Sequence, residues 1–227
     1  CSFIPKPFTA AAVLTLAACL AANVVVFTLV NAVLLDAVDV PEPQALVQVG
    51  NQYPNAGAAA NAGSNSGVPD YFDRKRDMTV LEETALYRET GVTVSGSGLG
   101  EAERIQSMLV TPSFFRVVRA QAHRGQVFTD AHGELGQEKV VILSHGFWQR
   151  LFGGRDDAIG LDLRLGGEPH KIVGVMPPGF RFPDDIDVWW RLRWDLSQHS
   201  RSAHFMEGVA RLADDATLAT VEQAHFH

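Results

Sequence analysis

The residue types best suited to catalysis stand side by side at Ser144 and His145, in the segment LSHGF. The serine nucleophile of an α/β-hydrolase lies in a G-x-S-x-G turn, whose strain exposes the hydroxyl to the substrate. LSHGF does not match that pattern, so a Ser/His nucleophile is the less favoured interpretation. We expect Ser144 to cap a short helix and His145 to be an exposed residue of its first turn.

Histidines are the next candidates, because imidazole is the commonest metal ligand. No two of them form the H-E-x-x-H pattern, which places two ligands and a general base on one helix face. His199 and His204, expected in a loop and at the start of a strand, could meet at a metal, but a solvated pair is the favoured interpretation. The 8 histidines lie at positions 123, 132, 145, 170, 199, 204, 225 and 227.

Three acidic residues stand close together at Asp184, Asp185 and Asp187. A calcium-binding loop also needs a glycine at its sharp turn and a distal glutamate. This segment lacks both, so we interpret the three as solvated turn residues. The run SGSGLG at 95–100 has neither dinucleotide nor P-loop spacing and predicts a hairpin turn. These patterns predict no catalytic residue, no cofactor and no metal site.

Composition narrows the class of protein. The 227 residues carry a net charge of −7 with scattered basic residues, which argues against a nucleic-acid-binding surface. The cysteines, Cys1 and Cys19, lie at the terminus and inside an apolar run, so no disulfide is expected in the remainder. We assign the tryptophans to packing, with Trp189 or Trp190 as an alternative contact for a partner.

One long apolar run near the N-terminus is expected to determine where the rest of the chain lies. Residues 8–35, FTAAAVLTLAACLAANVVVFTLVNAVLL, contain no charged side chain. As a helix the run would reach roughly 40 Å, enough to cross a hydrocarbon core of about 30 Å. Small residues at four-residue spacing, such as Ala18 and Ala22, favour packing against other helices. Lys6 before the run favours an N-terminus on the inside. A cleaved signal peptide and a buried core helix are the alternatives.

The rest of the chain predicts a mixture of strands and helices. In order, we expect a strand at 46–49, a flexible loop at 54–67, a helix at 68–88, strands at 86–94 and 104–110, a helix that begins at Thr111-Pro112, a strand at 204–212 and a helix that Thr217 caps.

The best-patterned part spans residues 138–192. EKVVILS predicts a buried strand, and HGFWQRLF predicts a helix that ends at a Gly-Gly pair. Leu161, Leu163 and Leu165 alternate with polar residues, so 161–176 predicts a hairpin with three leucines on one face. The aromatic segments PPGFRFP and DVWW are expected to be irregular.

The most specific stretch is VVILSHGFWQRLFGGRDDAIGLDLRLGGEPHKIVGVMPPGFRFP, which FFRVVRAQAHRGQVFT precedes. The apolar run is followed by PEPQALV, and VPDYFDRKRD and HFMEGVARL…TLATVEQA complete the set. Together these segments closely resemble the MacB-like family of ABC transporter permeases, over nearly the whole chain.

The resemblance implies an α+β fold, with a transmembrane helix at 8–35 and a two-lobed periplasmic core domain at 41–227. Residues 41–100 and 203–227 would form a split α/β lobe, and 101–202 an inserted β-rich lobe. Family members work as dimers with a cytoplasmic ATPase, whose closure is transmitted through the membrane helices to the periplasmic lobes. Their substrates include drugs, peptides and lipoproteins.

Further expectations follow from the resemblance. The chain is expected to be non-catalytic, without cofactor, and to cross the bacterial inner membrane once with its domain in the periplasm. Its expected partners are a cytoplasmic ABC ATPase subunit, a second permease half or copy, the lipid bilayer and a periplasmic protein, with no nucleic acid.

Three residues depart from the family pattern, namely Asp36, Asp39 and Asp215. Aspartate tolerates left-handed backbone better than most residues, so we expect the turn at Asp215 to survive. The second, third and fourth membrane helices of the family are absent from this sequence. We therefore interpret the chain as a fragment, as a degraded reading frame or as one piece of a larger protein.

Three functions compete at this point. The leading hypothesis is the membrane anchor and extracytoplasmic domain of a permease, which couples cytoplasmic ATP hydrolysis to export or periplasmic work. The alternative is a single-span membrane-anchored periplasmic binding or sensor module, whose lobes close on a ligand. A secreted enzyme behind an uncleaved anchor, with Ser144 as nucleophile, is the least favoured.

Overall fold

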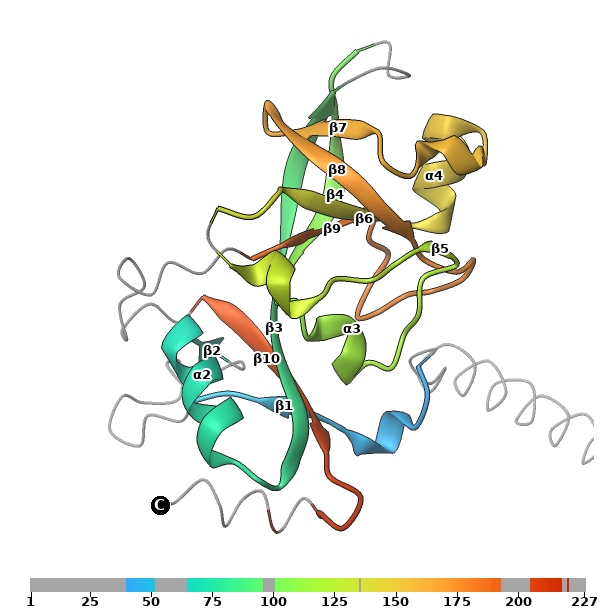
Figure 1. Ribbon diagram of the computed structural model, residues 1–227. Coiled ribbons are helices and arrows are strands. Elements are labelled where there is room, and N and C mark those ends of the chain that lie inside the picture. Colours follow the sequence, from blue (N-terminus) through green and yellow to red (C-terminus); the bar gives the residue numbers. More distant parts are fainter. Residues whose placement is uncertain are drawn as a thin grey trace, which may run out of the picture. The chain divides into compact units, whose positions relative to one another are not determined.

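The computed structural model describes residues 40–51, 65–95, 101–134, 136–192, 205–217 and 220 (Figure 1). The chain separates into two compact units, Cys1–Val38 and Asp39–His227, and every described residue belongs to the second, which we call the body. The predicted membrane helix at 8–35 lies outside the described residues. Within the described ranges, no helix is both long and apolar enough to cross a membrane.

The body is a mixed α/β fold around one large sheet. Its strands are β1 Leu46–Val49, β2 Asn65–Ser66, β3 Leu81–Ser95, β4 Glu103–Val110, β5 Arg124–Gly125, β6 Val140–Leu143, β7 Asp162–Leu165, β8 Glu168–Val175, β9 Val188–Arg191 and β10 Met206–Leu212. Its α-helices are α2 Val68–Asp77, α3 Phe114–Val117 and α4 His145–Phe152, with 3-10 helices η1 Pro43–Ala45, η3 Asp130–Gly133 and η4 Asp156–Ala158.

Most of the sheet closes on itself. Among the described residues, ten strands join in the order β1-β10-β3-β4-β9-β6-β8-β5, with β2 added to β10. β7 pairs with both β8 and β3, so β3, β4, β9, β6, β8 and β7 form a ring (upper part of Figure 1). β3 links the ring to the other strands of the sheet, because its residues 81–87 pair with β10 and its residues 87–94 pair with β4.

Alternation along these strands supplies the hydrophobic cores. One cluster draws apolar side chains from every strand of the ring and includes Phe147 and Trp148 of α4. A second cluster packs Phe114 and Phe115 of α3 against the fully buried Trp189. Inward-facing residues at every second strand position are what a half-buried sheet requires, so both clusters follow directly from the strand pattern.

Helix α2 is shorter than predicted. It ends at Asp77 rather than at 88, and β3 begins at Leu81 rather than at 86. LEETALYRE contains good helix formers, but residues 81–87 pair with β10 along their length. Long-range pairing therefore overrides the local propensity, which is a weak determinant on its own.

Three further predictions need correction. Residues 188–191 are not irregular: they form β9, parallel to β4 and antiparallel to β6. The third leucine of the predicted hairpin, Leu161, precedes β7 and is 44% exposed, whereas Leu163 and Leu165 are buried. Thr111 does not cap α3, because Ser113 occupies the N-cap position.

Several predictions are confirmed. The strands β1, β4 and β6, the hairpin β7–β8 and the helix α4 lie where the sequence indicates. The Thr217 hydroxyl oxygen accepts a hydrogen bond from the Thr220 N–H (3.4 Å), as an N-cap would. The rest of that helix, most of the loop at 54–67 and residues 96–100 lie outside the described residues. The division into a split and an inserted lobe stays a prediction.

Candidate functional site

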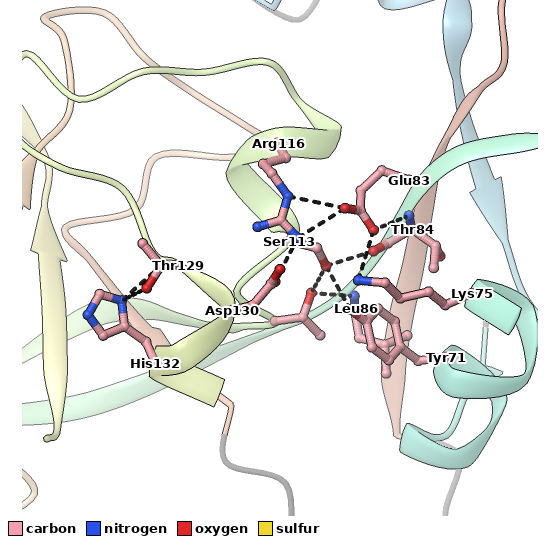
Figure 2. Close-up of polar contacts among 11 residues, drawn as sticks. Tyr71, Lys75, Glu83, Thr84, Leu86, Ser113, Arg116, Thr129, Asp130 and His132 are labelled. Atoms are coloured by element: carbon pink, nitrogen blue, oxygen red, sulfur yellow. Dashed lines mark hydrogen bonds and ion pairs between the residues drawn. The ribbon is translucent and has the colours of Figure 1, made fainter. Parts of the chain in front are cut away.

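A buried hydroxyl is the centre of a polar junction that joins α2, β3 and α3 (Figure 2). We use the name polar junction for Tyr71, Lys75, Glu83, Thr84, Leu86, Thr111, Ser113, Arg116 and Asp130.

Ser113 is fully buried and donates from Oγ to the Thr84 carbonyl oxygen at 2.7 Å. Its oxygen also lies 3.1 Å from the Tyr71 hydroxyl and 3.0 Å from Thr111 Oγ1. A serine hydroxyl has one proton and two acceptor sites, so Tyr71 and Thr111 are the donors to Ser113. Thr111 Oγ1 in turn accepts from the Leu86 N–H at 3.2 Å.

Arg116 of α3 forms the charged side of the junction. Its Nη2 lies 3.0 Å from Glu83 Oε2 on β3 and 2.7 Å from Asp130 Oδ1 on η3. Lys75 of α2 reaches the other oxygen of Glu83 at 3.4 Å. Exposed pairs of this kind contribute little one by one. Here the guanidinium of Arg116 and the carboxylate of Glu83 together link four elements, namely α2, β3, α3 and η3.

A second polar cluster lies where the chain joins the body. Arg211 of β10, 1% exposed at its side chain, donates Nε to the Val117 carbonyl oxygen at 2.7 Å. Its other nitrogens donate to the carbonyl oxygens of Pro41 (3.0 Å) and Glu42 (3.3 Å). Burial, helped by the neighbouring Arg119, lowers the pKa of Arg211. A buried cation is tolerated only when its donors find partners, and here each of the three nitrogens donates to a carbonyl oxygen.

Ser144 and His145 are not arranged as nucleophile and base. Ser144 Oγ accepts from the Phe147 N–H at 3.1 Å, which makes it the predicted N-cap of α4. The ring of His145 packs edge-to-face on Trp148, with the centroids 5.4 Å apart, and also faces His123. Ser144 is therefore the helix cap that was predicted, whereas His145, which was predicted to be exposed, is half-buried against Trp148.

The acidic residues at 184–187 have separate partners. Asp185 pairs with Arg181 at 2.8 Å. Asp187 lies 3.8 Å from Arg150, but burial outweighs that cation and raises the pKa of Asp187. A hollow of about 370 Å³ separates this loop from the start of α4. In the part of the chain that the structure describes, no three His, Cys, Asp or Glu side chains are placed to hold a metal ion.

The remaining candidates lie apart. Trp189 is fully buried, so it packs the core and is not a partner contact. The half-buried Trp190 lines a hollow of about 250 Å³ with Leu109 and His170, whose pKa is lowered by burial. His199, His204 and Trp194 lie outside the described residues.

Sequence analysis missed the residues that organise both polar clusters. Ser113 and Arg116 were hidden inside an apparently apolar segment, SFFRVV, and Arg211 inside GVARL. A charged residue in the middle of an apolar strand was the available signal, since arginine is almost never fully buried without partners.

The fold is that of extracytoplasmic domains of ABC-type transporters. The extracellular domain of the noncanonic ABC-type transporter YknZ from Gram-positive bacteria aligns with a TM-score of 0.56 at 14% identity, over 79% of this chain and 88% of that one. The periplasmic region of MacB from Actinobacillus actinomycetemcomitans also gives 0.56, at 11% identity, over 79% and 78%. A putative permease domain from Porphyromonas gingivalis gives 0.52 at 13% identity, over 70% and 67%.

The chain belongs to the family of MacB-like periplasmic core domains, whose model matches residues 9–225. The macrolide export ATP-binding/permease protein MacB of Bordetella avium (strain 197N) is 25% identical over 158 residues, 68% of this chain. MacB 1 of Aeromonas hydrophila subsp. hydrophila is 25% identical over 116 residues, 50% of this chain. These alignments span 22% and 18% of the two relatives. The predicted resemblance is confirmed.

Proposed function

We propose that this chain is the membrane anchor and extracytoplasmic domain of an ABC transporter permease, which relays ATP-driven movement to the outer side of the membrane. The family match carries the proposal, because it begins inside the apolar run and continues through the body. In this proposal, residues 8–35 cross the bacterial inner membrane once and 41–227 stand in the periplasm as two lobes.

The body has the construction that a relay of movement needs. A relay must pass displacement from one part to another without deforming, which close-packed interiors and fixed polar contacts favour. The closed ring of strands supplies the close-packed interior, and the polar junction supplies the fixed polar contacts. β3, which pairs with β10 over one half and β4 over the other, would carry movement between the proposed lobes.

The proposed partners follow from the family. ATP hydrolysis would take place in a separate cytoplasmic ABC ATPase subunit, and this chain would be non-catalytic. A second copy or permease half would complete the unit, and a periplasmic protein would receive the work. The transported substrate would be a drug, a peptide or a lipoprotein.

Membrane fractionation of the intact chain tests the proposal. We expect the chain in the membrane pellet after alkaline carbonate washing, because an uncharged run of this length partitions into lipid. The variant Val25→Arg, which places a charge in the middle of that run, should be extracted. Recovery of the unaltered chain in the soluble fraction, or ATP turnover by the purified chain alone, would overturn the proposal.

A binding or sensor module is the second candidate, and the hollow beside Trp190 favours it. The indole N–H of Trp190 is buried and has no hydrogen-bond partner among the described residues. Leu109 adds an apolar side chain to the lining of this hollow, which is completed by His170, Lys139, Glu168 and Arg191. Saturable quenching of tryptophan fluorescence by an apolar probe, lost in Trp190→Leu, would support this function, and a linear response would refute it.

A further inference from the structure

The segment that joins the body, residues 40–45, is held from two sides. We call it the strap. On the inner side, Arg211 binds its backbone at Pro41 and Glu42 while also binding Val117 at the end of α3. On the outer side, the Glu42 carboxylate pairs with Arg119, which lies just beyond α3. Arg119 also binds Glu82 of β3 at 2.8 Å.

We call Glu42 and Arg119 the outer pair, and both residues have a strained backbone. Glu42 and Arg119 each have φ of 51°, and among the described residues they are the non-glycine positions with positive φ. Left-handed backbone costs an L-residue other than glycine about 1–2 kcal/mol. Such strain persists only where contacts with the surrounding structure hold the residue in that conformation. The two strained residues are bound to each other, and the same Glu42 carboxylate also lies 3.7 Å from Arg211 Nη1, so the conformation of Glu42 is held by both arginines.

The outer pair is accessible and has space beside it. The side chains of Glu42 and Arg119 are 55% and 34% exposed, whereas that of Arg211 is 1% exposed. A hollow of about 310 Å³ lies between the strap, Arg119 and residues 212–216, where the chain leaves β10. Loss of the outer pair would therefore release strain and allow the strap to move without breaking the core.

We propose that Glu42, Arg119 and Arg211 form a latch on the strap. In the closed state, the strap moves together with β10 and α3. In the open state, Glu42 and Arg119 relax from their left-handed conformations and the strap moves independently of the body. The role of the latch rests on the proposed function, because the latch would determine whether movement of the membrane helix reaches the body. Its members are positioning residues.

The competing explanation is a static anchor, in which the same contacts hold the strap permanently and no open state is used. Two substitutions of Arg119 distinguish the latch from the static anchor. Arg119→Ala removes the ion pair and keeps the backbone strain at residue 119, whereas Arg119→Gly removes the ion pair and that strain; Glu42 remains strained in both variants. A latch predicts that the alanine variant opens more, because only it also gains by relaxing residue 119. A static anchor predicts that the glycine variant opens at least as much, because glycine is the more flexible residue.

Hydrogen–deuterium exchange of the intact chain in detergent micelles measures the opening. We expect the Gln44 and Ala45 amides to exchange at least about fivefold faster in Arg119→Ala than in Arg119→Gly. Ile142 of β6 should be unchanged, which excludes global unfolding. Arg155→Ala, which removes an exposed arginine paired with Asp157, is the matched control and should leave the strap unchanged.

Salt gives an independent readout. Raising NaCl from about 50 mM to about 500 mM should speed exchange of the strap in the unaltered chain and not in Arg119→Ala, because only an exposed ion pair is screened. Equal or faster exchange in Arg119→Gly, or no salt effect, overturns the latch. The exchange measurement needs no partner protein. Recovery of the chain in the soluble fraction would therefore refute the proposed function, but it would not change the exchange rates that test the latch.

Discussion

Leu46, near the start of β1, lies opposite Arg211, near the end of β10, in an antiparallel register. The chain therefore enters the body and leaves the sheet at neighbouring positions. β10 also receives β3 on its other side, so among the described strands β1 lies at the edge of the sheet, beside a β10 that is paired on both sides.

Docking of β1 depends on a glycine in β10. A Cβ at Gly208 would lie 2.3 Å from the Val49 carbonyl oxygen and 3.1 Å from Ser66 Oγ. Gly208→Ala should destabilise the body by about 1–3 kcal/mol, as overpacking does, and should speed amide exchange in β1. Urea unfolding followed by tryptophan fluorescence measures the first effect.

Gly146 of α4 provides the matched control for that substitution. No atom lies within 4 Å of a Cβ built there. Gly146→Ala should be neutral or stabilising by up to about 1 kcal/mol, because alanine is the better helix former. Equal stability of the two alanine variants would contradict the close approach of β1 to β10.

Ser113 should be coupled energetically to Tyr71. Ser113→Ala leaves the buried Thr84 carbonyl without its donor, and we expect a loss of about 1–3 kcal/mol. Tyr71→Phe should cost less in the Ser113→Ala background than alone, because the hydroxyl has already lost that acceptor. A double-mutant cycle from urea unfolding provides the coupling energy, and additivity within about 0.5 kcal/mol would refute the junction.

Local signals explain what sequence reasoning predicted well. Helix α4 begins at Ser144, which caps it, and ends at Gly153, whose φ of 61° suits glycine. Its boundaries therefore depend on the two residues that directly flank the helix. The alternating leucines at 163 and 165 likewise predicted a strand whose partner follows after a two-residue turn.

Long-range contacts explain what sequence reasoning missed. β9 has only four residues and is buried between β4 and β6, so its sequence shows no alternation. The first half of β3 is extended because β10, more than a hundred residues later, pairs with it. Arg211 is buried because carbonyls from two distant segments surround it. None of these partners is visible from the neighbouring sequence.

Stability should depend on pH through Glu89. The partial desolvation of this largely exposed carboxyl first, and then the charges of Asp184 and Glu207, raise the pKa of Glu89. A raised pKa means that the folded state favours the protonated form, so ionisation opposes folding at neutral pH and not below the ordinary value. Glu89→Gln should therefore raise the melting temperature at pH 8 and leave it unchanged at pH 4. The gain should stay below about 1 kcal/mol, because the side chain is exposed.

Glu101→Gln is the control for that experiment, because it removes the same charge from another exposed site just before β4. Thermal unfolding of both variants across pH 4–8 separates a local effect from one of net charge. A lower melting temperature of Glu89→Gln at pH 8, or an equal gain at pH 4, would contradict the assigned environment.

Ser144 should behave as a helix cap and not as a nucleophile. Ser144→Ala should cost about 1 kcal/mol, and Ser144→Asp should retain most of that stability because aspartate is an equally good N-cap. A fluorophosphonate probe should not label the unaltered chain. Labelling that Ser144→Ala abolishes would instead support the secreted enzyme.

The placement of the body outside the membrane is tested most directly by cysteine labelling. Glu101→Cys, in a background of Cys1→Ala and Cys19→Ala, puts a single thiol at an exposed position ahead of β4. In intact bacterial spheroplasts we predict full reaction of this thiol with a membrane-impermeant maleimide. Labelling that occurs only after the cells are lysed would contradict an extracytoplasmic body.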